Sequence, residues 1–419
     1  MAKMIHIIGL GVAENAELAA QAQAALLAAD IVIGSERQID VVRSLFTKDS
    51  VVEFLFLPKL SELKTVINSA AEKTIAVLAS GDPLFYGIGR WFTKHFAAQQ
   101  LHFYPAVSSV QAACHQLGWS LQDVDVLSLH GRPLEKIRLH LKAQSKLAIL
   151  TDKNSQPEDL AEECWLAGFE HSSIWVCEKL GYADQTVREF SVQELLEESF
   201  DFDPLHVSLI DLKGEGGFLP NFPGIPDHHF ITGTVSGKGM ISKREVRLQI
   251  LSMLQAANED VIWDIGAGCG GVAVELAYWN QRIAVHAIEC HEQRLLYLQQ
   301  NQQRFGVVSN CHIVAGRAPE CLTTLPMPNK VFIGGSDGEL QALLQQVWQL
   351  LPIGGVIVAS AVIEGTKQQL QAFALSLLPA QVECVELAVK RGSINAEAEL
   401  DFKAKLPVQI FKFIKTGES

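Results

Sequence analysis

An acidic residue before two glycines, and a second acid after the next predicted strand, form the pattern with the most chemical content in this chain. Asp264, Gly266 and Gly268 follow a short apolar run and precede an apolar pattern with helical spacing. Glycines let the backbone turn tightly and approach a ligand closely, and a helix start presents free N–H groups. Glu289 ends the strand expected at 283–288, where a carboxylate can accept the hydroxyl groups of a ribose. This spacing predicts a nucleoside-containing ligand.

The glycines alone do not identify that ligand, because Gly266, Gly268 and Gly271 also satisfy the dinucleotide pattern G-x-G-x-x-G. Asp264 and Glu289 favour a different cofactor. D-x-G-x-G followed by such an acid resembles the S-adenosylmethionine (SAM) site of Rossmann-like methyltransferases. A nicotinamide site in an oxidoreductase, and a strand–turn–helix corner that binds nothing, are the alternatives.

The composition limits the class of protein. At 419 residues with 48% apolar residues, the chain can form two or three domains with full-sized cores. No signal peptide is recognisable, and no run of about 18 apolar residues predicts a membrane span, so we expect a cytoplasmic protein without a membrane partner. The net charge of −13 argues against a nucleic-acid partner. It also means that an anionic substrate must be held by a local cluster of cations.

The cysteines and a histidine pair do not indicate a metal site. The eight cysteines are scattered without C-x-x-C or zinc-like spacing. Cys269 lies in the glycine turn, but no partner base for a catalytic thiol is evident, and a small buried hydrophobe is the simpler interpretation. His228 and His229 fit a solvated linker better than a pair of metal ligands. The sequence therefore predicts no metal.

The segment 214–226 is rich in Gly and Pro and is interpreted as a linker between domains at 1–213 and 227–419. The second domain alternates strands and helices, which predicts an α/β fold with a mostly parallel sheet covered on both faces. Ligands of such a sheet lie at the carboxyl ends of its strands. Residues 402–406 and 408–414 could form a terminal hairpin. The other expected elements are strands at 261–263, 283–288, 311–314, 330–335 and 354–360, and helices at 293–305 and 340–351.

The first half is also α/β, with an alanine-rich helix expected at 16–29. Five predicted strands each end in a loop of small, polar or glycine residues, which indicates a binding surface built from several loops. The loop at 80–89 combines glycines, a proline and Asp82, a composition that serves turns and not cores. The five strands are expected at 4–8, 74–79, 101–104, 124–129 and 146–150.

The loops of the first half carry a family resemblance. S-G-D-P-L-F-Y-G-I-G at 80–89 and P-A-V-S-S-V-Q at 105–111 resemble the tetrapyrrole (corrin/porphyrin) methyltransferases. S-L-H-G-R at 128–132 and L-T-D-K-N-S at 150–155 are similar to the branch that methylates carbon 5 of a precorrin. The second half resembles the precorrin decarboxylases and carbon-15 methylases. Its motifs are G-I-P-D at 224–227, I-S-K-R-E-V-R at 241–247, W-D-I-G-A-G at 263–268, F-I-G-G-S at 332–336 and G-E-L at 338–340.

The resemblance spans nearly all of the chain. It implies a bifunctional SAM-dependent enzyme of cobalamin biosynthesis, which methylates a precorrin at carbons 5 and 15 and removes an acetate carboxyl group. The residues fit a metal-free and a cobalt-containing ring equally, and the families suggest a homo-oligomer. The cofactor contacts implied for the first domain are Gly9, Gly81, Asp82, Pro83, Tyr86, Ser108, Ser109 and Thr151. Those implied for the second domain are Ser242, Gly266, Ala267, Gly268, Cys269, Gly270, Glu289 and Ala318.

Three positions depart from the family pattern. G-L-G-V-A at 9–13 replaces the usual G-x-G-P-G, Ser242 stands where Thr is usual, and Asp337 stands where Gly is common. The altered first loop motivates a second hypothesis, in which only the C-terminal domain is catalytic and the N-terminal half is a binding module.

A precorrin carries many carboxylates, which call for cationic side chains, preferably with planar donor forks. Lys243 and Arg247 at the start of a predicted helix, and Arg132 in the first half, are predicted to bind it. A solvated basic face is the alternative. His130 is a candidate proton carrier near neutral pH, or a hydrogen-bonded structural histidine, and Asp82 is the other candidate catalytic group. Methyl transfer from SAM requires no Ser/His/Asp set, and none is visible.

Overall fold

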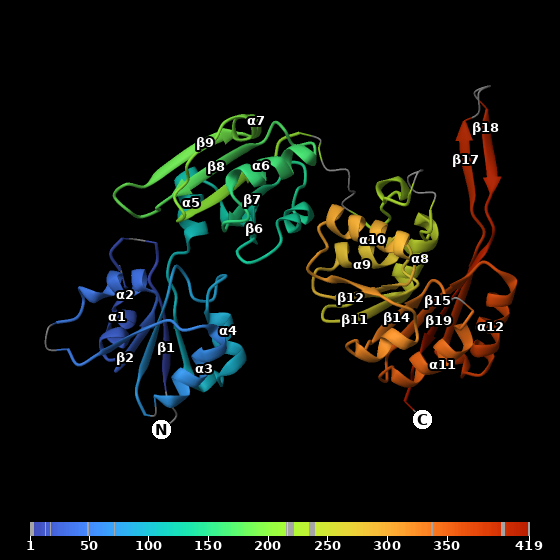
Figure 1. The fold of residues 1–419 in the computed structure, drawn as a ribbon, viewed down its shortest axis with the longest axis horizontal. Coiled ribbons are helices and arrows are strands. Elements are labelled where there is room, and N and C mark those ends of the chain that lie inside the picture. The colour runs from blue at the N-terminus through green and yellow to red at the C-terminus, as the bar shows by residue number, and fades with distance from the viewer. Residues whose placement is uncertain are drawn as a thin grey trace. The chain divides into compact units, whose positions relative to one another are not determined.

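The computed structural model describes residues 4–12, 14–16, 18–47, 50–70, 72–214, 216, 222–233, 239–336, 338–394 and 399–417. It divides into two compact α/β units, each of which is described by itself (Figure 1). Unit 1 comprises Met1–Leu134 and His140–Gly216, and unit 2 comprises Glu135–Leu139 and Gly217–Ser419. Residues 215 and 217–221 of the predicted linker, together with Ala13 and Asp337, lie outside the described residues. No helix within the described ranges is long and apolar enough to cross a membrane.

Unit 1 contains two five-stranded sheets. The first is parallel, in the order β3-β2-β4-β1-β5, and its central strands are buried nearly throughout, as expected for a sheet covered on both faces. The predicted helix at 16–29 is shorter in the structure, because the backbone is extended at Ala19 (ψ 147°) and the helix begins only at Ala20. The elements are β1 (Ile5–Gly9), α1 (Ala20–Leu27), β2 (Ile31–Gly34), α2 (Glu36–Arg43), β3 (Glu53–Phe56), α3 (Leu60–Ser69), β4 (Ile75–Ala79), α4 (Gly89–His95) and β5 (Leu101–Tyr104).

The second sheet of unit 1 is mixed, in the order β6-β7-β10-β8-β9. Strands β6 and β7 pair in parallel, whereas β10 is antiparallel to both β7 and β8. The five strands predicted from the first half are confirmed, but they divide between the two sheets. The elements are α5 (Ser109–Leu117), β6 (Val124–Ser128), β7 (Lys146–Leu150), α6 (Pro157–Leu166), β8 (Ser173–Glu178), β9 (Thr186–Ser191), α7 (Val192–Glu197) and β10 (His206–Asp211).

Unit 2 contains a seven-stranded sheet in the order β13-β12-β11-β14-β15-β19-β16. The first five strands are parallel and the last two pairings are antiparallel, so the predicted mostly parallel sheet is confirmed. Helices α8, α9 and α10 cover one face, and α11 and α12 cover the other (Figure 1). The elements are α8 (Arg244–Leu254), β11 (Val261–Ile265), α9 (Gly271–Trp279), β12 (Ala284–Glu289), α10 (Glu292–Arg304), β13 (Cys311–Ala315), β14 (Lys330–Ile333), α11 (Leu340–Leu350), β15 (Val356–Ala361), α12 (Glu364–Leu375), β16 (Val382–Leu387) and β19 (Val408–Ile414).

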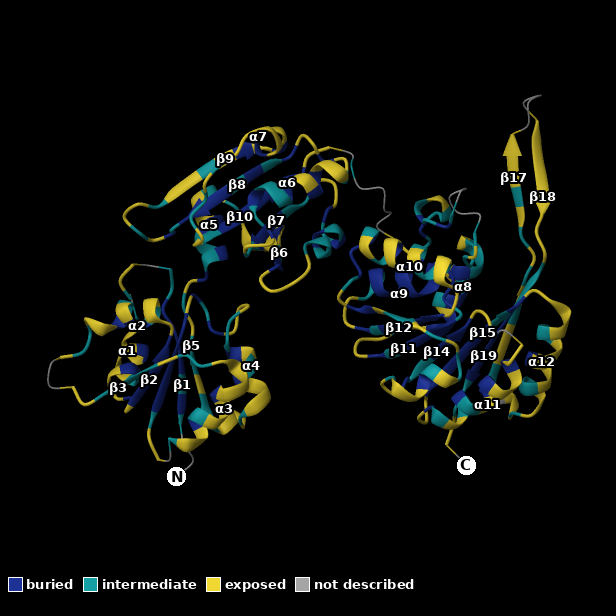
Figure 2. Ribbon diagram, in the orientation of Figure 1, coloured by how far each residue is buried: buried dark blue, intermediate teal, exposed yellow. Residues whose placement is uncertain are grey.

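The predicted terminal hairpin of 402–406 with 408–414 is wrong. Strand β19 lies inside the large sheet between β15 and β16, where its apolar side chains are buried. The preceding strand, β18 (Leu400–Ala404), pairs instead with β17 (Lys390–Ile394), and this two-stranded ribbon is largely exposed (Figure 2).

Candidate functional sites

Unit 2 has a cavity of about 590 Å³ at the carboxyl ends of β11, β12, β14 and β15. This is the edge at which α/β sheets bind ligands. The predicted residues that line it are Ser242, Lys243, Gly266, Ala267, Gly268, Glu289 and Ala318. Cys269 and Gly270 lie behind the lining: Cys269 is buried, and a Cβ on Gly270 would meet Leu298 Cδ1 at 2.4 Å.

Glu289 is the central acceptor of this C-terminal cavity. Its Oε1 accepts the N–H groups of Cys290 and His291, both at 2.9 Å, and its Oε2 accepts the N–H of Gly268 at 2.9 Å. A carboxylate offers about four acceptor positions, so one position on Oε2 is left for a ligand hydroxyl. Arg294 Nη1 lies 3.9 Å from the same oxygen. The side chain therefore both fixes the glycine turn and can receive a ligand.

The glycines of the turn serve loop packing. A Cβ on Gly266 would lie 2.7 Å from the backbone N of Gly335, and a Cβ on Gly268 would lie 2.5 Å from the Met240 carbonyl oxygen. Both glycines have positive φ, 74° and 60°. Three loops therefore meet in backbone contact around the cavity, which any larger side chain would force apart.

Asp264 is fully buried beneath the turn. Its Oδ2 accepts the N–H of Ala273 in the first turn of α9 at 2.9 Å, and its Oδ1 has no partner among the described residues. Burial raises the pKa of Asp264 to about 7, the Ala273 hydrogen bond opposes the rise, and the Glu289 carboxylate adds to it. Two carboxyl groups beside a helix N-terminus disfavour the pyrophosphate of a dinucleotide and suit a ligand with a positive charge.

We expect Asp264→Asn to remove a pH dependence from the stability of unit 2. Because the pKa is raised in the folded state, Asp264 stabilises unit 2 most below about pH 4, and its contribution falls as the pH rises towards 7. The free energy of unfolding of the variant relative to the wild type should therefore rise between pH 4 and 7, by up to about 4 kcal/mol. Urea unfolding at several pH values, read from hydrogen exchange of β11, measures it. Parallel profiles of the two proteins would contradict the assignment.

Unit 1 has its own cavity, of about 790 Å³, where loops of both its sheets meet. The predicted residues that line this N-terminal cavity are Gly81, Asp82, Tyr86, Ser108, Ser109, His130, Arg132 and Thr151. Gly9 and Pro83 lie behind the lining. A Cβ on Gly9 would meet the Gly81 carbonyl oxygen at 2.6 Å, so Gly9 allows the first two strand-end loops to pack closely.

The polar side chains of the N-terminal cavity are held by local contacts. Asp82 Oδ1 accepts the N–H groups of Leu84 and Phe85, at 2.8 and 3.1 Å, so Asp82 stabilises the turn that carries Tyr86. The contacts of Asp82 give it a structural role, and nothing in them indicates the catalytic role considered from the sequence. Thr151 Oγ1 lies 2.9 Å from His206 Nε2.

His130 and Arg132 are both exposed on the cavity side of a turn. Asp152 Oδ2 accepts the N–H of Gly131, which has positive φ, at 2.7 Å, and this bond fixes the turn between them. The hydrogen bonds from Gly131 and Asn154 hold the pKa of Asp152 below its usual value.

The sequence interpretation missed several cations. Arg37 and Arg90 line the N-terminal cavity, and Arg294 and Arg317 line the C-terminal one. The sequence position of Arg294 could have indicated a place at the cavity, because Arg294 lies in the first turn of the helix that directly follows Glu289. Arg317 carried none, since an isolated arginine in a loop is a common surface residue.

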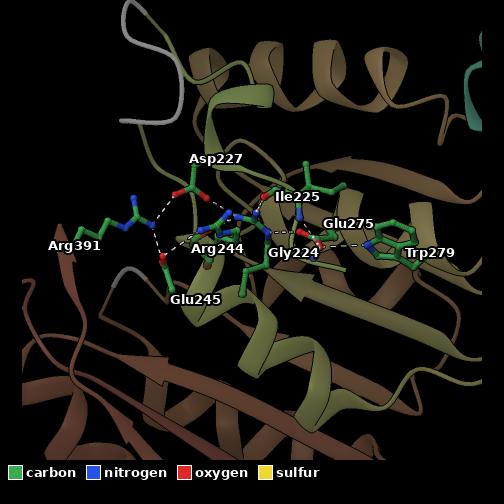
Figure 3. Close-up of polar contacts among 10 residues, drawn as sticks. Gly224, Ile225, Asp227, Arg244, Glu245, Glu275, Trp279 and Arg391 are labelled. Atoms are coloured by element: carbon green, nitrogen blue, oxygen red, sulfur yellow. Dashed lines mark hydrogen bonds and ion pairs between the residues drawn. The ribbon is translucent and has the colours of Figure 1, made fainter. Parts of the chain in front are cut away.

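The predicted substrate role of Arg247 does not fit its position, and this prediction is corrected. The Arg247 side chain is completely buried and does not line the cavity. Its guanidinium donates to Glu275, to Asp227 and to the carbonyl groups of Ile225 and Ser242. Figure 3 labels the partners Glu275, Asp227 and Ile225. All three guanidinium nitrogens are thus engaged within the protein, and none is available to a substrate. Lys243 does line the cavity, and burial lowers the pKa of its ammonium group.

One group of side chains among the described residues has metal-ligand chemistry. Potential ligand atoms of Glu289, Cys290 and His291 lie within 4.8 Å of one another. Both Glu289 oxygens already accept backbone N–H groups, so the group is explained as the end of β12 and gives no independent sign of a metal.

Comparisons with known proteins cover both units. Residues 4–196 match the tetrapyrrole (corrin/porphyrin) methylases, and residues 234–415 match the precorrin methyltransferase domain. The chain is 33% identical over 361 residues to a precorrin-6Y C(5,15)-methyltransferase (decarboxylating) from Sinorhizobium sp, covering 85% of this chain and 84% of the relative. A cobalt-precorrin-7 C(5)-methyltransferase from Salmonella typhimurium is 29% identical over 50% of this chain and 99% of its own. A probable cobalt-precorrin-6B C(15)-methyltransferase (decarboxylating) from Pyrobaculum calidifontis is 33% identical over 41% of this chain and 85% of its own.

Proposed function

Because the chain belongs to the precorrin-6Y C(5,15)-methyltransferase (decarboxylating) family, we propose that its two cavities divide the two methylations between them, each with its own SAM. The enzyme methylates a precorrin at carbons 5 and 15 and removes a carboxyl group, in cobalamin biosynthesis. The family expected from the motifs is thus confirmed. In this proposal unit 1 methylates carbon 5, and unit 2 methylates carbon 15 and catalyses the decarboxylation.

The proposal for unit 2 rests on two hydrogen-bond-accepting carboxyl groups at the ends of strands β11 and β12. Glu289 keeps one acceptor position open at the cavity, and Asp264 places a second carboxyl group beneath the same turn. SAM supplies a methyl group on a positively charged sulfonium, together with ribose hydroxyls and an ammonium group. Acceptors and negative charge suit these groups, so Ser242, Gly266, Gly268 and Ala318 would form the remaining walls of the site.

Unit 1 supports a donor site of another kind. Its cavity is built from the ends of several strands, with Gly11, Gly81, Ser108 and Thr151 as small or hydroxyl-bearing walls. The altered first loop still supplies Gly11 to the lining, and Gly81 N–H donates to the Gly11 carbonyl at 3.1 Å. The departure from G-x-G-P-G therefore leaves a formed cavity, as a unit with its own donor site requires.

The chemistry requires placement of the substrate more than it requires a reactive side chain. The bridge carbons of a reduced tetrapyrrole are nucleophilic, and alignment with a methyl donor can supply roughly 7–11 kcal/mol. Loss of an acetate carboxyl group as CO₂ leaves electrons that the conjugated ring can absorb. The chain's part is to hold the remaining carboxylates. Lys243, Arg294 and Arg317 can do so at one cavity, and Arg90 and Arg132 at the other.

Isothermal titration calorimetry of the whole protein with SAM tests the proposal. We expect two SAM molecules to bind per chain, because each unit has a cavity with the required lining. Mass spectrometry of the product from precorrin and SAM should then show loss of CO₂ and gain of two methyl groups. Binding of a single SAM, or a product that carries only one new methyl group, would favour the hypothesis that unit 1 is a binding module. A homo-oligomer, suggested by the family resemblance, can be checked by sedimentation.

A further inference from the structure

The buried Arg247 lies behind the C-terminal cavity and touches a loop that lines it. Residues 239–243, called here the cofactor loop, precede α8 and contribute Ser242 and Lys243 to the cavity wall. Arg247 Nη1 donates to the Ser242 carbonyl oxygen at 2.6 Å. The guanidinium therefore holds the end of the loop from outside the cavity, which Arg247 does not line.

The cofactor loop packs on the glycine turn through further contacts that depend on its position. The Met240 carbonyl oxygen accepts the N–H of Cys269 at 3.0 Å, and a Cβ on Gly271 would lie 2.5 Å from Ile241 Cγ1. The Met240 backbone thus contacts the glycine turn, and the Ile241 side chain packs against the first residue of α9. A displacement of the loop by an ångström would change the shape of the cavity at its glycine wall.

The second partner of Arg247 is Glu275, which lies on α9 and is fully buried. Its Oε1 accepts the N–H of Gly224 at 2.6 Å, the N–H of Ile225 at 3.2 Å and the indole N–H of Trp279 at 3.2 Å. The ion pair therefore joins the first turn of α8 to the middle of α9, and the two side chains fasten the segment before the cofactor loop to both helices.

The outer end of the network reaches the exposed ribbon. Asp227 Oδ1 accepts from Arg247 at 3.1 Å, while its Oδ2 accepts from Arg391 on β17 at 3.1 Å. Arg391 also donates to Glu245 of α8 at 2.6 Å (Figure 3). Cations and acids alternate along this network, so each charge of the buried part is compensated.

We propose that Arg247 is a positioning residue for the C-terminal donor site, which sets the cofactor loop against the glycine turn without touching the ligand. A guanidinium is suited to this task, because its planar fork can reach Glu275, Asp227 and the Ser242 carbonyl at once. A buried pair that only stabilised the fold would be replaceable by apolar side chains of similar volume. The inference rests on the proposed SAM site of unit 2.

The test uses the full chain and reads each unit separately. Photolabelling with SAM that carries a radioactive methyl group, followed by proteolytic mapping, gives the half-saturating SAM concentration of each unit. In Arg247→Lys the charge stays but the fork is lost, so the value for unit 2 should rise about tenfold, while the value for unit 1 stays unchanged. Amide exchange of residues 239–243 in the ligand-free protein should become severalfold faster. These two readouts do not depend on catalysis.

Two further variants separate positioning from stability. Lys330→Met breaks an ion pair, 2.9 Å long, between the half-buried Lys330 and the buried Asp260, at the amino end of β14 and away from the cavity. It should lower the melting temperature without changing SAM labelling. The double variant Arg247→Met with Glu275→Leu should recover stability but not SAM affinity. The inference is overturned if Arg247→Lys leaves labelling and loop exchange unchanged, or if the double variant labels normally. Failure of the wild-type unit 2 to label would instead refute the proposed SAM site.

Discussion

Glu289→Ala is expected to lower decarboxylation and carbon-15 methylation by about 100-fold or more while leaving carbon-5 methylation intact. The substitution removes the acceptor of three backbone N–H groups, from Gly268, Cys290 and His291, together with the remaining acceptor position for the donor. The loss of a ligand hydroxyl contact and of the turn that shapes the site corresponds to about 3 kcal/mol or more, which is about 100-fold in rate. CO₂ release from the precorrin measures the first activity. Methyl transfer to a substrate already decarboxylated and methylated at carbon 15 measures the second.

The control for this prediction is Glu292→Ala. Glu292 is an exposed acid in the first turn of α10, close to Glu289 in sequence but absent from the cavity lining. Glu292→Ala removes the same charge as Glu289→Ala but leaves the hydrogen bonds of the glycine turn in place. Both activities should therefore stay within about twofold of the wild type, as for most surface substitutions. Equal loss of both activities in Glu289→Ala would show that the two units do not work separately.

The positions of the strands could be predicted from the sequence because burial leaves a direct signature. Strands such as β4 and β12 are apolar runs of strand length that end in glycine or polar turns, and ligand sites of α/β sheets lie at those ends. The pairing of the last strands could not be predicted in this way. The segment of β19 is preceded by Pro407 and by 402–406, in which apolar residues alternate with lysines, and this is the local pattern of a hairpin. In the structure β19 pairs with β15 and β16, because this position buries its apolar side chains within the large sheet. Such burial is a property of the assembled fold and not of the local sequence.

The true position of Arg247 left a signal in the sequence. Arg247, Ile250 and Leu254 share one helical face at spacings of three and four residues, and all three are buried. Glu275 gives the matching signal, because it interrupts an otherwise apolar helix in which a charge must find a partner. The prediction that Lys243 and Arg247 both bind the substrate rested on their charge alone and did not use this periodicity. The partnership itself brings together α8 and α9 and required the fold.

Gly81→Val is expected to produce the reciprocal defect, in which carbon-5 methylation is lost and decarboxylation with carbon-15 methylation remains. Gly81 has a φ of 63°, and its Cβ would lie 3.1 Å from the Ser108 Cα, at the point where two strand-end loops of unit 1 approach each other. A β-branched residue is strongly disfavoured at positive φ, and its methyl groups would point among the cavity loops. We expect at least a 100-fold fall in carbon-5 methylation, equivalent to about 3 kcal/mol.

The matched control is Gly118→Val, because Gly118 has nearly the same φ, 65°, but a Cβ there meets nothing within 4 Å, and Gly118 does not line the cavity. Both variants carry similar backbone strain, so a difference in carbon-5 methylation reports on the cavity and not on folding. Methyl groups labelled with ¹³C and located by NMR distinguish the two ring positions. If Gly81→Val still delivers a methyl group to carbon 5 at the rate of Gly118→Val, the N-terminal cavity is not the site of that transfer. Reciprocal losses in Glu289→Ala and Gly81→Val would support a separate donor site in each unit, because the loss of a single shared donor site would lower transfer to both carbons together.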